Sequence, residues 1–569
     1  MRAAWTLYLN PTKNTHMDNI RLLLLGTFAF LSLLLYNAWQ EDYALQPPVA
    51  STTPAESRSA AVPDVTTSAL PSAPTSDTPG IVPKVATTTS FNGEVVKVKT
   101  DLFDIEISTV GGSIISAKLL KYPVSPKTPD LKFHLLNRTT NDPFIAQSGL
   151  ISSEEALAPN HEAVFSVEQS EYQLADGEET LDVKLIWQKA DGIKVVKHFI
   201  FNRGSYLIEV VHDVSNNSGT TWTGRDYAQL MRGEPSETNS FIYTYTGGVV
   251  YSQETKYEKY DFGDMADVDL NRDETNGWIA MIQHYFLAAW VPPTGQKEHF
   301  YSKDLGENRY IIGGYSPAVT LQPGDSHQFS KKLFVGPKLQ EQLVKVAPGL
   351  ELTVDYGWLT VVSQPIFWLL QKLHDIVGNW GWAIILLTIL IKAAFFKLSE
   401  ASYKSMANMR RMTPRMTALK DRYGDDKARL NKAMMDLYKT EKINPLGGCL
   451  PMLVQIPVFI ALYWVLLESV EMRQAPFILW MDNLSAKDPY FILPLIMGVS
   501  MFVQQKLNPT PPDPLQAKMM MALPFVFTIF FAFFPSGLVL YWVVNNLISI
   551  TQQYFITRRI EAQAAEAKK

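Results

Sequence analysis

The final part of this 569-residue chain carries nearly all of its long apolar runs, and no other feature restricts the possible fold as strongly. An α-helix needs about 20 apolar residues to cross a hydrocarbon layer of about 30 Å. Five candidate spans lie at residues 378–398 and, within residues 446–557, at 446–468, 490–506, 519–535 and 537–557. The rest of the chain is mostly polar, which brings the mean hydropathy to −0.02. The runs predict a polytopic α-helical membrane protein.

A further apolar run near the N-terminus, residues 20–39, is also long enough to span a membrane. Arg21 stands at its start and an acidic pair follows it, which places the N-terminus in the cytoplasm. We interpret residues 17–40 as an uncleaved signal anchor. The alternative, a cleaved signal peptide, needs a small-x-small site that we do not find after the run. Residues 1–16 are either a short cytoplasmic tail or a mis-assigned start that precedes the true first residue, Met17.

The polar region between these runs divides into a linker and a domain. Residues 41–90 are rich in Pro, Ser, Thr and Ala, which predicts a flexible periplasmic linker. Residues 91–345 contain short runs in which apolar and polar side chains alternate, and Asp191-Gly192 between two of them is a hairpin signal. Helical periods are scarce in this region. We therefore predict an all-β sandwich domain.

Aromatic residues of the predicted sandwich allow two interpretations. Such residues can line a groove for a sugar or a peptide, but more often they form the core, and we favour the core. They are Trp278, Tyr285, Phe286 and Trp290. A sugar enzyme would also need paired carboxylates, whereas the acidic residues of this region are scattered along the chain.

Charges outside the apolar runs predict the topology. Residues 397–442 hold twelve Lys/Arg against six Asp/Glu, a net charge of +6, which leaves −11 for the rest of a chain whose total is −5. Basic loops stay in the cytoplasm, whereas the loop at 468–488 has a net charge of −2. We predict six spans with both termini cytoplasmic, a cytoplasmic tail at 558–569 and the sandwich in the periplasm. Residues 346–377 have the spacing of an amphipathic helix that lies in the membrane interface.

The basic segment at residues 399–445 is predicted to form a cytoplasmic helical hairpin. It breaks at Tyr423-Gly424, with Asp425 placed to cap the second helix. Its methionines suit either adaptable contacts with apolar partners or packing of the hairpin on itself. Its basic charge suits anionic lipid headgroups or, as a less favoured partner, ribosomal RNA. The residues that we expect to make contacts are Met406, Met409, Arg410, Arg411, Met412, Arg415 and Met416.

Lys392 is the strongest candidate for a functional residue because it lies inside the run at 378–398. A charge near the middle of a bilayer costs about 2.5–3.5 kcal/mol and is usually kept for a function. The alternative is snorkelling, since Lys397 lies only about 8 Å further along the helix. Thr388 shares the helix face of Lys392. Polar residues of the other spans either join neighbouring helices or line a wet cavity with this lysine. They are Gln455, Gln504, Gln505, Asn545 and Asn546, with Tyr541 and Trp542 on the same helix faces as the two asparagines.

Four motifs carry a family resemblance. They are Asn444-Pro-Leu-Gly-Gly-Cys-Leu-Pro451, Gln455-Ile-Pro457, Phe534-Pro-Ser-Gly-Leu-Val-Leu-Tyr541-Trp542 and Gly424-Asp-Asp-Lys427. With the layout of the chain, they resemble the YidC/Oxa/Alb family of membrane protein insertases in its Gram-negative form, which has a large periplasmic domain. The resemblance implies a β-supersandwich, a five-helix insertase core and a hydrophilic groove open to the cytoplasm and to lipid.

The resemblance also implies roles for individual residues. Lys392 stands where the family commonly has an arginine as the groove cation, and the change keeps the charge but loses the planar fork. Thr388, Tyr541 and Trp542 match positions that contact the substrate. Gln455 and Gln505 match groove-lining positions.

The implied function is that of an insertase and chaperone for nascent inner-membrane proteins, acting alone or with the Sec translocon and its accessory subunits. The ribosome and the signal-recognition machinery are further candidate partners, whereas a net charge of −5 argues against DNA. We find no Walker loop, no Gly-x-Ser-x-Gly, no His-Glu-x-x-His and a single cysteine, Cys449, so we expect no enzyme, metal or cofactor. The alternatives are a secondary transporter, which should show internal repeats, and a membrane-tethered periplasmic carbohydrate-binding protein.

Overall fold

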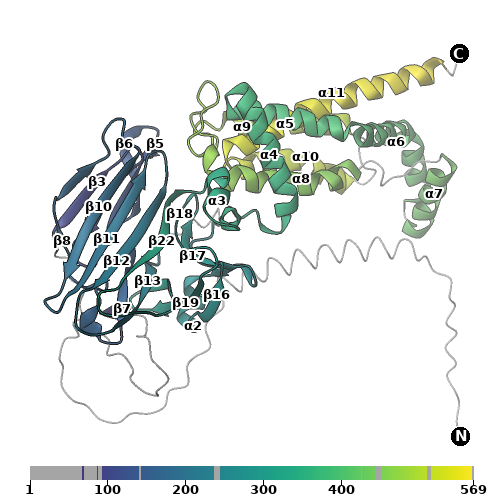
Figure 1. The fold of residues 1–569 in the computed structure, drawn as a ribbon. Helices are drawn as coiled ribbons and strands as arrows, with labels where there is room; N and C mark the ends of the chain where they lie inside the picture. The colour runs from purple at the N-terminus through teal and green to yellow at the C-terminus, as the bar shows by residue number, and fades with distance from the viewer. Residues whose placement is uncertain are drawn as a thin grey trace, which may run out of the picture. The chain divides into compact units, whose positions relative to one another are not determined.

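The computed structural model describes residues 67–68, 86–87, 93–139, 142–235, 244–424, 426–441, 450–508 and 514–566, all within one compact unit, Val65–Lys569. The predicted signal anchor lies outside the described residues, as does most of the predicted linker. Within that linker the structure pairs two short strands, β1 (Thr67–Ser68) and β2 (Ala86–Thr87). The remaining described residues form a β-rich part up to Pro337 and a helical part after it (Figure 1).

The β-rich part consists of two large sheets whose buried faces share one hydrophobic core (Figure 1). The nine-stranded sheet has the order β15 (Lys256–Tyr260), β14 (Gly247–Ser252), β17 (Trp278–Gln283), β18 (Phe286–Val291), β22 (Ser326–Pro337), β12 (Leu207–Asn216), β11 (Ile193–Asn202), β10 (Thr180–Gln188), β8 (Ser166–Val167). The eleven-stranded sheet has the order β16 (Asn271–Thr275), β19 (Lys297–Asp304), β20 (Arg309–Tyr315), β13 (Trp222–Gly233), β7 (Phe144–Ser152), β5 (Ser113–Ser125), β4 (Phe103–Ser108), β3 (Val95–Lys99), β9 (Glu171–Gln173), with β21 (Val319–Leu321) beside β13 and β6 (Thr128–Leu136) beside β5. This arrangement matches the predicted sandwich.

The β10–β11 hairpin shows how the sequence pattern produces the sheets. Side chains of β11 alternate between buried and half-buried positions, because successive side chains of a strand point to opposite faces. The two strands pair up to Gln188 opposite Lys194. Gly192 in the turn has a φ of 104°, and a Cβ there would lie 2.5 Å from the Asn217 carbonyl oxygen, so the turn requires glycine. The predicted Asp191-Gly192 hairpin is confirmed.

The aromatic residues of the β-rich part belong mainly to its core. Trp278, Phe286 and Trp290 are buried in the shared core, so the core interpretation is confirmed for them and the groove interpretation is wrong. Tyr285 is half-buried and stacks on His284, with 3.7 Å between the ring centroids.

Two short helical segments interrupt the strands. They are a 3₁₀ turn at Glu155–Leu157 and helix α2 at Phe262–Asp267. The Asp261 carboxylate caps α2 by accepting a hydrogen bond from the Asp264 amide. The sequence pattern did not predict α2 because six residues make less than two helical turns.

Among the described residues, the helical part contains helices α3 to α11 and three 3₁₀ turns. The helices are α3 (Gln340–Val346), α4 (Thr360–Val377), α5 (Trp380–Ala394), α6 (Phe396–Tyr423), α7 (Lys427–Thr440), α8 (Leu450–Glu468), α9 (Ile492–Leu507), α10 (Pro514–Phe531) and α11 (Ser536–Glu566). The 3₁₀ turns are Leu350–Thr353, Gly357–Leu359 and Val470–Met472.

Helix α4 has the two faces that the sequence predicts for residues 346–377, although the helix begins only at Thr360. Phe367 and Leu370 are buried, whereas Trp368 is 60% exposed and Val361 is 83% exposed. Such exposure of large apolar side chains is typical of a surface that water does not cover in the working protein.

The predicted second span, residues 378–398, is not one straight helix. Helix α5 ends at Ala394, and α6 continues at an angle of 67° to it. The axis bends because Phe395 has a non-helical backbone, with φ −90° and ψ 11°. The apolar run is therefore divided between two helices.

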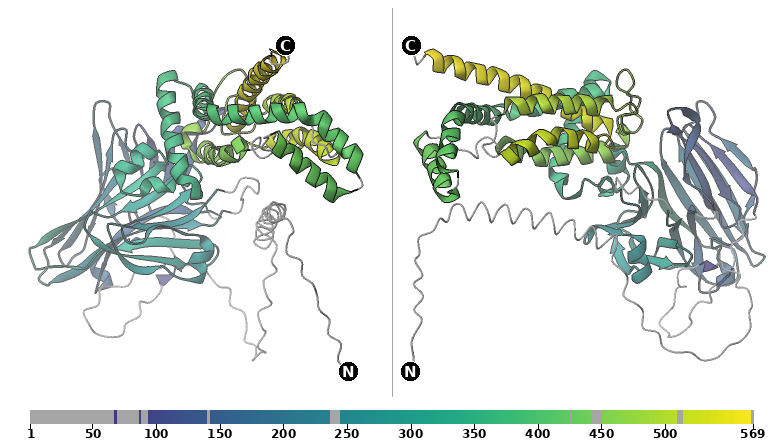
Figure 2. Two further views of the ribbon diagram at one scale, coloured as in Figure 1. Left: turned by 90° about the vertical axis from the view of Figure 1, so that its right-hand side faces the viewer. Right: turned by 180° about the vertical axis from the view of Figure 1, so that it is seen from behind.

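Length and composition give a limited result for membrane crossing. Taken singly, none of the helices in the described ranges is both long and apolar enough to cross a membrane, whereas α5 and α6 pass that test as a bent pair. Six spans therefore remain a prediction. Helix α11 continues through the predicted tail at 558–569 as far as Glu566 (Figure 2), because the residues after the apolar run, rich in Ala, Glu and Gln, are strong helix formers.

The cap of the second hairpin helix differs from the prediction by one residue. Helix α7 begins at Lys427, and the carboxylate of Asp426 accepts hydrogen bonds from the amides of Ala428 and Arg429. An N-cap stands directly before the first helical residue, so Asp426 takes that role rather than Asp425, which lies outside the described residues.

Candidate functional site

Lys392 is buried near the C-terminal end of α5. Its side chain is 6% exposed, and its ammonium donates hydrogen bonds to the Ser549 hydroxyl at 2.8 Å and to Gln455 Oε1 at 3.3 Å. The side chain of Lys397, by contrast, is 92% exposed. Because the Lys392 ammonium is bonded inside the bundle, the snorkelling alternative is wrong.

Gln455 of α8 is held so that its oxygen faces Lys392. Its amide nitrogen donates to the Tyr541 hydroxyl at 3.3 Å and to Asn545 Oδ1. Both amide protons are then used, and the carbonyl oxygen is left for the ammonium. Tyr541, Asn545 and Ser549 stand four residues apart on α11, so they share one face of that helix. Three helices, α5, α8 and α11, therefore meet at one polar cluster.

The Lys392 ammonium is bonded to neutral groups. Among the residues that the structure describes, no carboxylate lies within ion-pair distance of it and none interacts with its charge. A buried charge without a counter-ion is unfavourable, and here only the dipoles of an amide and a hydroxyl offset that cost. The site is therefore a fixed positive charge suited to an anionic group. Nor do the described residues include a cluster of His, Cys, Asp or Glu that could hold a metal.

Thr388 and Gln505 make their hydrogen bonds away from Lys392, and their predicted contacts with a substrate stay predictions. Thr388 is 1% exposed, and its hydroxyl donates to the Ile384 carbonyl of the preceding turn at 2.7 Å. Gln505 Oε1 accepts from Asn508 at the end of α9, at 3.4 Å. Both side chains are engaged within their own segments rather than with Lys392.

Trp542 faces an aromatic cluster. Its ring contacts the rings of Phe459 and Phe531, with centroids 4.9 Å and 5.5 Å apart. Its indole nitrogen is buried and has no hydrogen-bond partner among the described residues. Sequence analysis missed Ser549, although the four-residue spacing from Tyr541 and Asn545 was a signal that would have found it.

The methionines of α6 divide into two groups. Met412 and Met416 are buried, as the packing interpretation expects, whereas Met406 and Met409 are half-buried. Arg410, Arg411 and Arg415 are exposed, and Arg415 forms an ion pair with Glu441 at 2.6 Å. The exposed guanidinium groups form a basic surface on α6.

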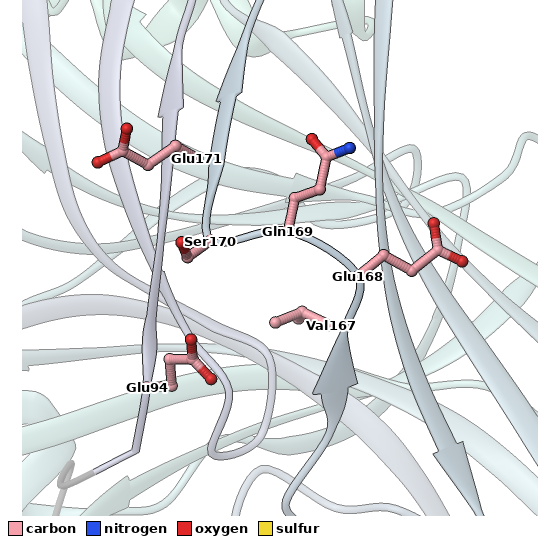
Figure 3. A pocket seen from close by; sticks show the side chains of 6 residues that line it. All are labelled: Glu94, Val167, Glu168, Gln169, Ser170 and Glu171. Carbon is pink, nitrogen blue, oxygen red and sulfur yellow. The ribbon is translucent and has the colours of Figure 1, made fainter.

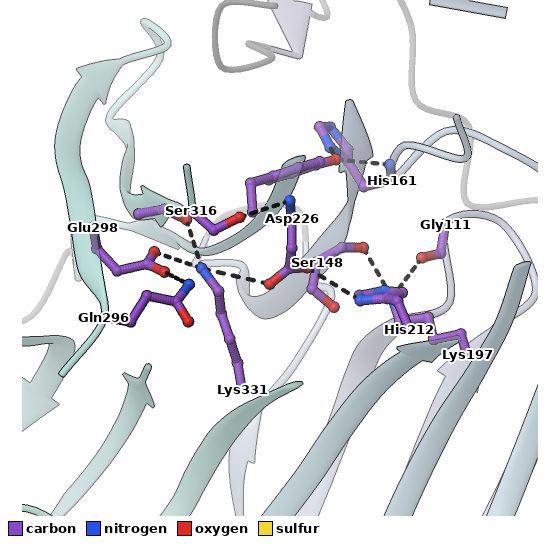
Figure 4. A network of polar contacts seen from close by, with 12 residues as sticks. Gly111, Ser148, His161, Lys197, His212, Asp226, Gln296, Glu298, Ser316 and Lys331 are labelled. Atoms are coloured by element: carbon purple, nitrogen blue, oxygen red, sulfur yellow. Dashed lines mark hydrogen bonds and ion pairs between the residues drawn. The ribbon is translucent and has the colours of Figure 1, made fainter. Parts of the chain in front are cut away.

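The β-rich part holds a buried charged network between its sheets (Figure 4). Lys331 of β22 contacts Glu298 of β19 at 2.6 Å and Asp226 of β13 at 3.5 Å, and His212 Nδ1 lies 3.1 Å from Asp226. Burial raises the pKa of Glu298, and Lys331 offsets part of that shift. Burial disfavours the Lys331 ammonium, but Glu298 and Asp226 outweigh it and raise the lysine's pKa.

This network corrects the expectation that the acidic residues of the domain are scattered. The fold brings Asp226 and Glu298 to one lysine because their strands belong to the same sheet and face its buried side. Asp226 is 2% exposed and Glu298 is 1% exposed. These carboxylates therefore cannot reach a sugar in solution, and the network serves the structure of the domain.

An open hollow lies at the end of the sheets, near β3, β8 and β9 (Figure 3). It has a volume of about 460 Å³ and is lined by Glu94, Val167, Glu168, Gln169, Ser170 and Glu171. Its carboxylates are solvated, and Glu171 contacts Lys97 at 3.5 Å in an exposed pair. Nothing in this lining favours a particular ligand.

Comparison with known proteins gives consistent matches along the chain. Residues 95–369 match the family model described as the YidC periplasmic domain, and residues 372–564 match that of the 60Kd inner membrane protein. The membrane protein insertase YidC of Methylococcus capsulatus is 52% identical over 554 residues, which cover 97% of this chain and 100% of the relative. That of Thioalkalivibrio sulfidiphilus is 52% identical over 96% of this chain and 99% of the relative.

Solved structures were also compared. A crystal structure of an active YidC insertase with its first transmembrane domain resolved has a TM-score of 0.38 and 20% identity, and the match covers 82% of this chain and 95% of that one. A galactose mutarotase related enzyme from Lactobacillus acidophilus has a TM-score of 0.29 and 12% identity, over 42% of this chain and 97% of that one.

The two family models define the class of the protein. It is a bacterial inner membrane protein with a β-rich periplasmic domain and a helical C-terminal region. Within that class, the chain belongs to the YidC family. Its relatives are named insertases rather than enzymes.

Proposed function

We propose that this protein inserts nascent inner-membrane proteins through a hydrophilic groove around Lys392, open to the cytoplasm and to lipid. The observation that carries the proposal is the buried Lys392 ammonium, which is bonded to Ser549 and Gln455 and has no carboxylate partner among the described residues. The acidic tail of an entering segment supplies the missing counter-charge. The relatives are named membrane protein insertases, which supports insertion over solute transport.

Two sources of free energy drive the proposed insertion: burial of apolar surface in lipid and the membrane potential. The tail loses water as it enters the groove, and Lys392 offsets part of that cost. The apolar segment then moves into lipid along a path that includes Thr388, Tyr541 and Trp542, and burial of its apolar surface drives this step. The membrane potential adds about 2.3 kcal/mol per acidic charge for each 100 mV. Gln455 and Gln505 line the wall of the groove in this proposal. Insertion makes and breaks no covalent bond, so we propose that the protein is not an enzyme.

The proposed topology has six spans and both termini in the cytoplasm. The β-rich domain then lies in the periplasm, and the α6–α7 hairpin lies on the cytoplasmic side with its basic surface toward anionic lipid. The exposed apolar face of α4 lies in the membrane interface.

The hairpin also receives clients in this proposal. Partners of the protein are nascent membrane proteins, the Sec translocon with its accessory subunits, and the ribosome with the signal-recognition machinery. Met406 and Met409 are half-buried and contribute adaptable apolar contacts beside the exposed Arg410 and Arg411.

Insertion into proteoliposomes that contain only the purified protein tests the proposal. A short single-span substrate with an acidic tail should be protected from external protease well above the level of empty liposomes. Lys392→Met should lower that protection about tenfold or more, Lys392→Arg should retain it, and Lys397→Met is the matched control at an exposed lysine. Equal protection with folded protein and with empty liposomes would refute autonomous insertion.

A further inference from the structure

The hydroxyl of Ser549 is hydrogen-bonded both to its own helix and to the Lys392 ammonium. A serine hydroxyl donates one hydrogen bond and accepts two. Ser549 Oγ donates to the Asn545 carbonyl at 2.7 Å and accepts from the Lys392 ammonium at 2.8 Å. Its donor is used on α11 itself, so its lone pairs are left for the lysine.

These contacts hold the Ser549 hydroxyl in one orientation. Ser549 is 2% exposed, and its proton is held by the carbonyl one turn earlier on α11. The oxygen therefore presents a lone pair to the buried Lys392 ammonium, which α5 contributes from another part of the chain.

We infer that Ser549 is a positioning residue for Lys392. The inference rests on the proposed function and adds the device that sets where the groove cation stands. Ser549 is the nearer of the two acceptors, at 2.8 Å against 3.3 Å for Gln455, and a hydroxyl can rotate to follow the ammonium. The ammonium is thereby held against α11, in the position where an acidic tail meets it.

Two variants test the inference in the proteoliposome assay with two substrates, one with an acidic tail and one with a neutral tail. Ser549→Ala should lower the initial rate for the acidic-tailed substrate about tenfold, since hydrogen bonds to charged groups are among the strongest, and change the neutral-tailed rate less than twofold. Ser549→Thr keeps the hydroxyl and should restore the rate.

A double variant separates positioning from a structural effect. If Ser549 acts through the lysine, Ser549→Ala should have no further effect in a Lys392→Met background. A loss of the same size in both backgrounds would overturn the inference, as would full activity of Ser549→Ala with the acidic tail. The matched control is Thr551→Ala, which removes an exposed hydroxyl that bonds only within α11.

The two proposals fail in different ways. If the unaltered protein inserts neither substrate, the proposed function fails. If it inserts both and the Ser549 variants behave like the Thr551 control, only the inference fails.

Discussion

Removal of the buried Lys331 ammonium should destabilise the β-rich domain strongly. Lys331→Met keeps the length and apolar stem of the side chain but leaves the carboxylates of Asp226 and Glu298 between the sheets without their shared cation. Breaking a buried ion pair by removing one partner typically costs about 3–5 kcal/mol, because the remaining charge stays desolvated. Since the two carboxylates are 2% and 1% exposed, water cannot replace the ammonium, and we expect a loss in that range.

The loss should also depend on pH in a defined direction. Burial already raises the pKa of Glu298, and loss of Lys331 raises it further. The folded variant then takes up a proton at a pH where the unfolded chain, with a pKa near its ordinary 4.5, does not. Stability from this group therefore increases as the pH falls toward about 5, so the deficit against the unaltered protein should shrink between pH 7.5 and pH 5.

Hydrogen exchange of the β12 and β22 amides in the detergent-solubilised full chain measures the opening free energy of these strands. The matched control is Lys332→Met, at the exposed neighbouring position of β22. Adding Glu298→Gln to Lys331→Met should recover part of the loss, since one of the stranded charges is removed. A loss below about 1 kcal/mol, or a deficit that grows as the pH falls, would refute the electrostatic reasoning.

Three further predictions concern other parts of the chain. Gly498→Ala should lower the free energy of unfolding of the helical region by about 1–3 kcal/mol, because a Cβ there would lie 2.0 Å from Thr528 Oγ1 on α10. The melting temperature should decrease accordingly, and an increase would contradict this prediction. Burial, and to a smaller extent the charge of Lys197, lower the pKa of His161 from 6.5 to about 4. Neutral His161 therefore contributes up to about 3 kcal/mol to the free energy of unfolding above pH 6.5, and this contribution is lost as the pH falls to 4. Chemical denaturation at pH 7.5 and pH 5 should show this loss, and His161→Gln should reduce it. Asp426→Ala should lower the opening free energy of the first turn of α7, measured by hydrogen exchange, by about 1 kcal/mol. An unchanged exchange rate in that turn would exclude a stabilising cap.

Local patterns in the sequence were sufficient for the class of the β-rich domain, for its Asp191-Gly192 hairpin and for the candidate cation. Alternation along β11 and the turn at Asp191-Gly192 act over a few residues, so they predicted strands and a hairpin that the structure has. Lys392 stood out because a charge in an apolar run is expensive wherever the helix packs. Local patterns did not predict the bend at Phe395, because a non-helical residue inside an apolar run leaves the pattern unchanged. They also ended the last helix at residue 557, where the apolar run stops, although α11 continues to Glu566.

Only the tertiary structure decided which polar groups meet. Helical spacing places Tyr541, Asn545 and Ser549 on one face of α11, but it does not indicate that Gln455 of α8 and Lys392 of α5 face them. Likewise, nothing local in β13, β19 or β22 indicates that two carboxylates share Lys331. The physical reason is that a buried charge must be satisfied by whichever acceptors packing brings within about 3 Å, and packing depends on the whole set of helices and strands.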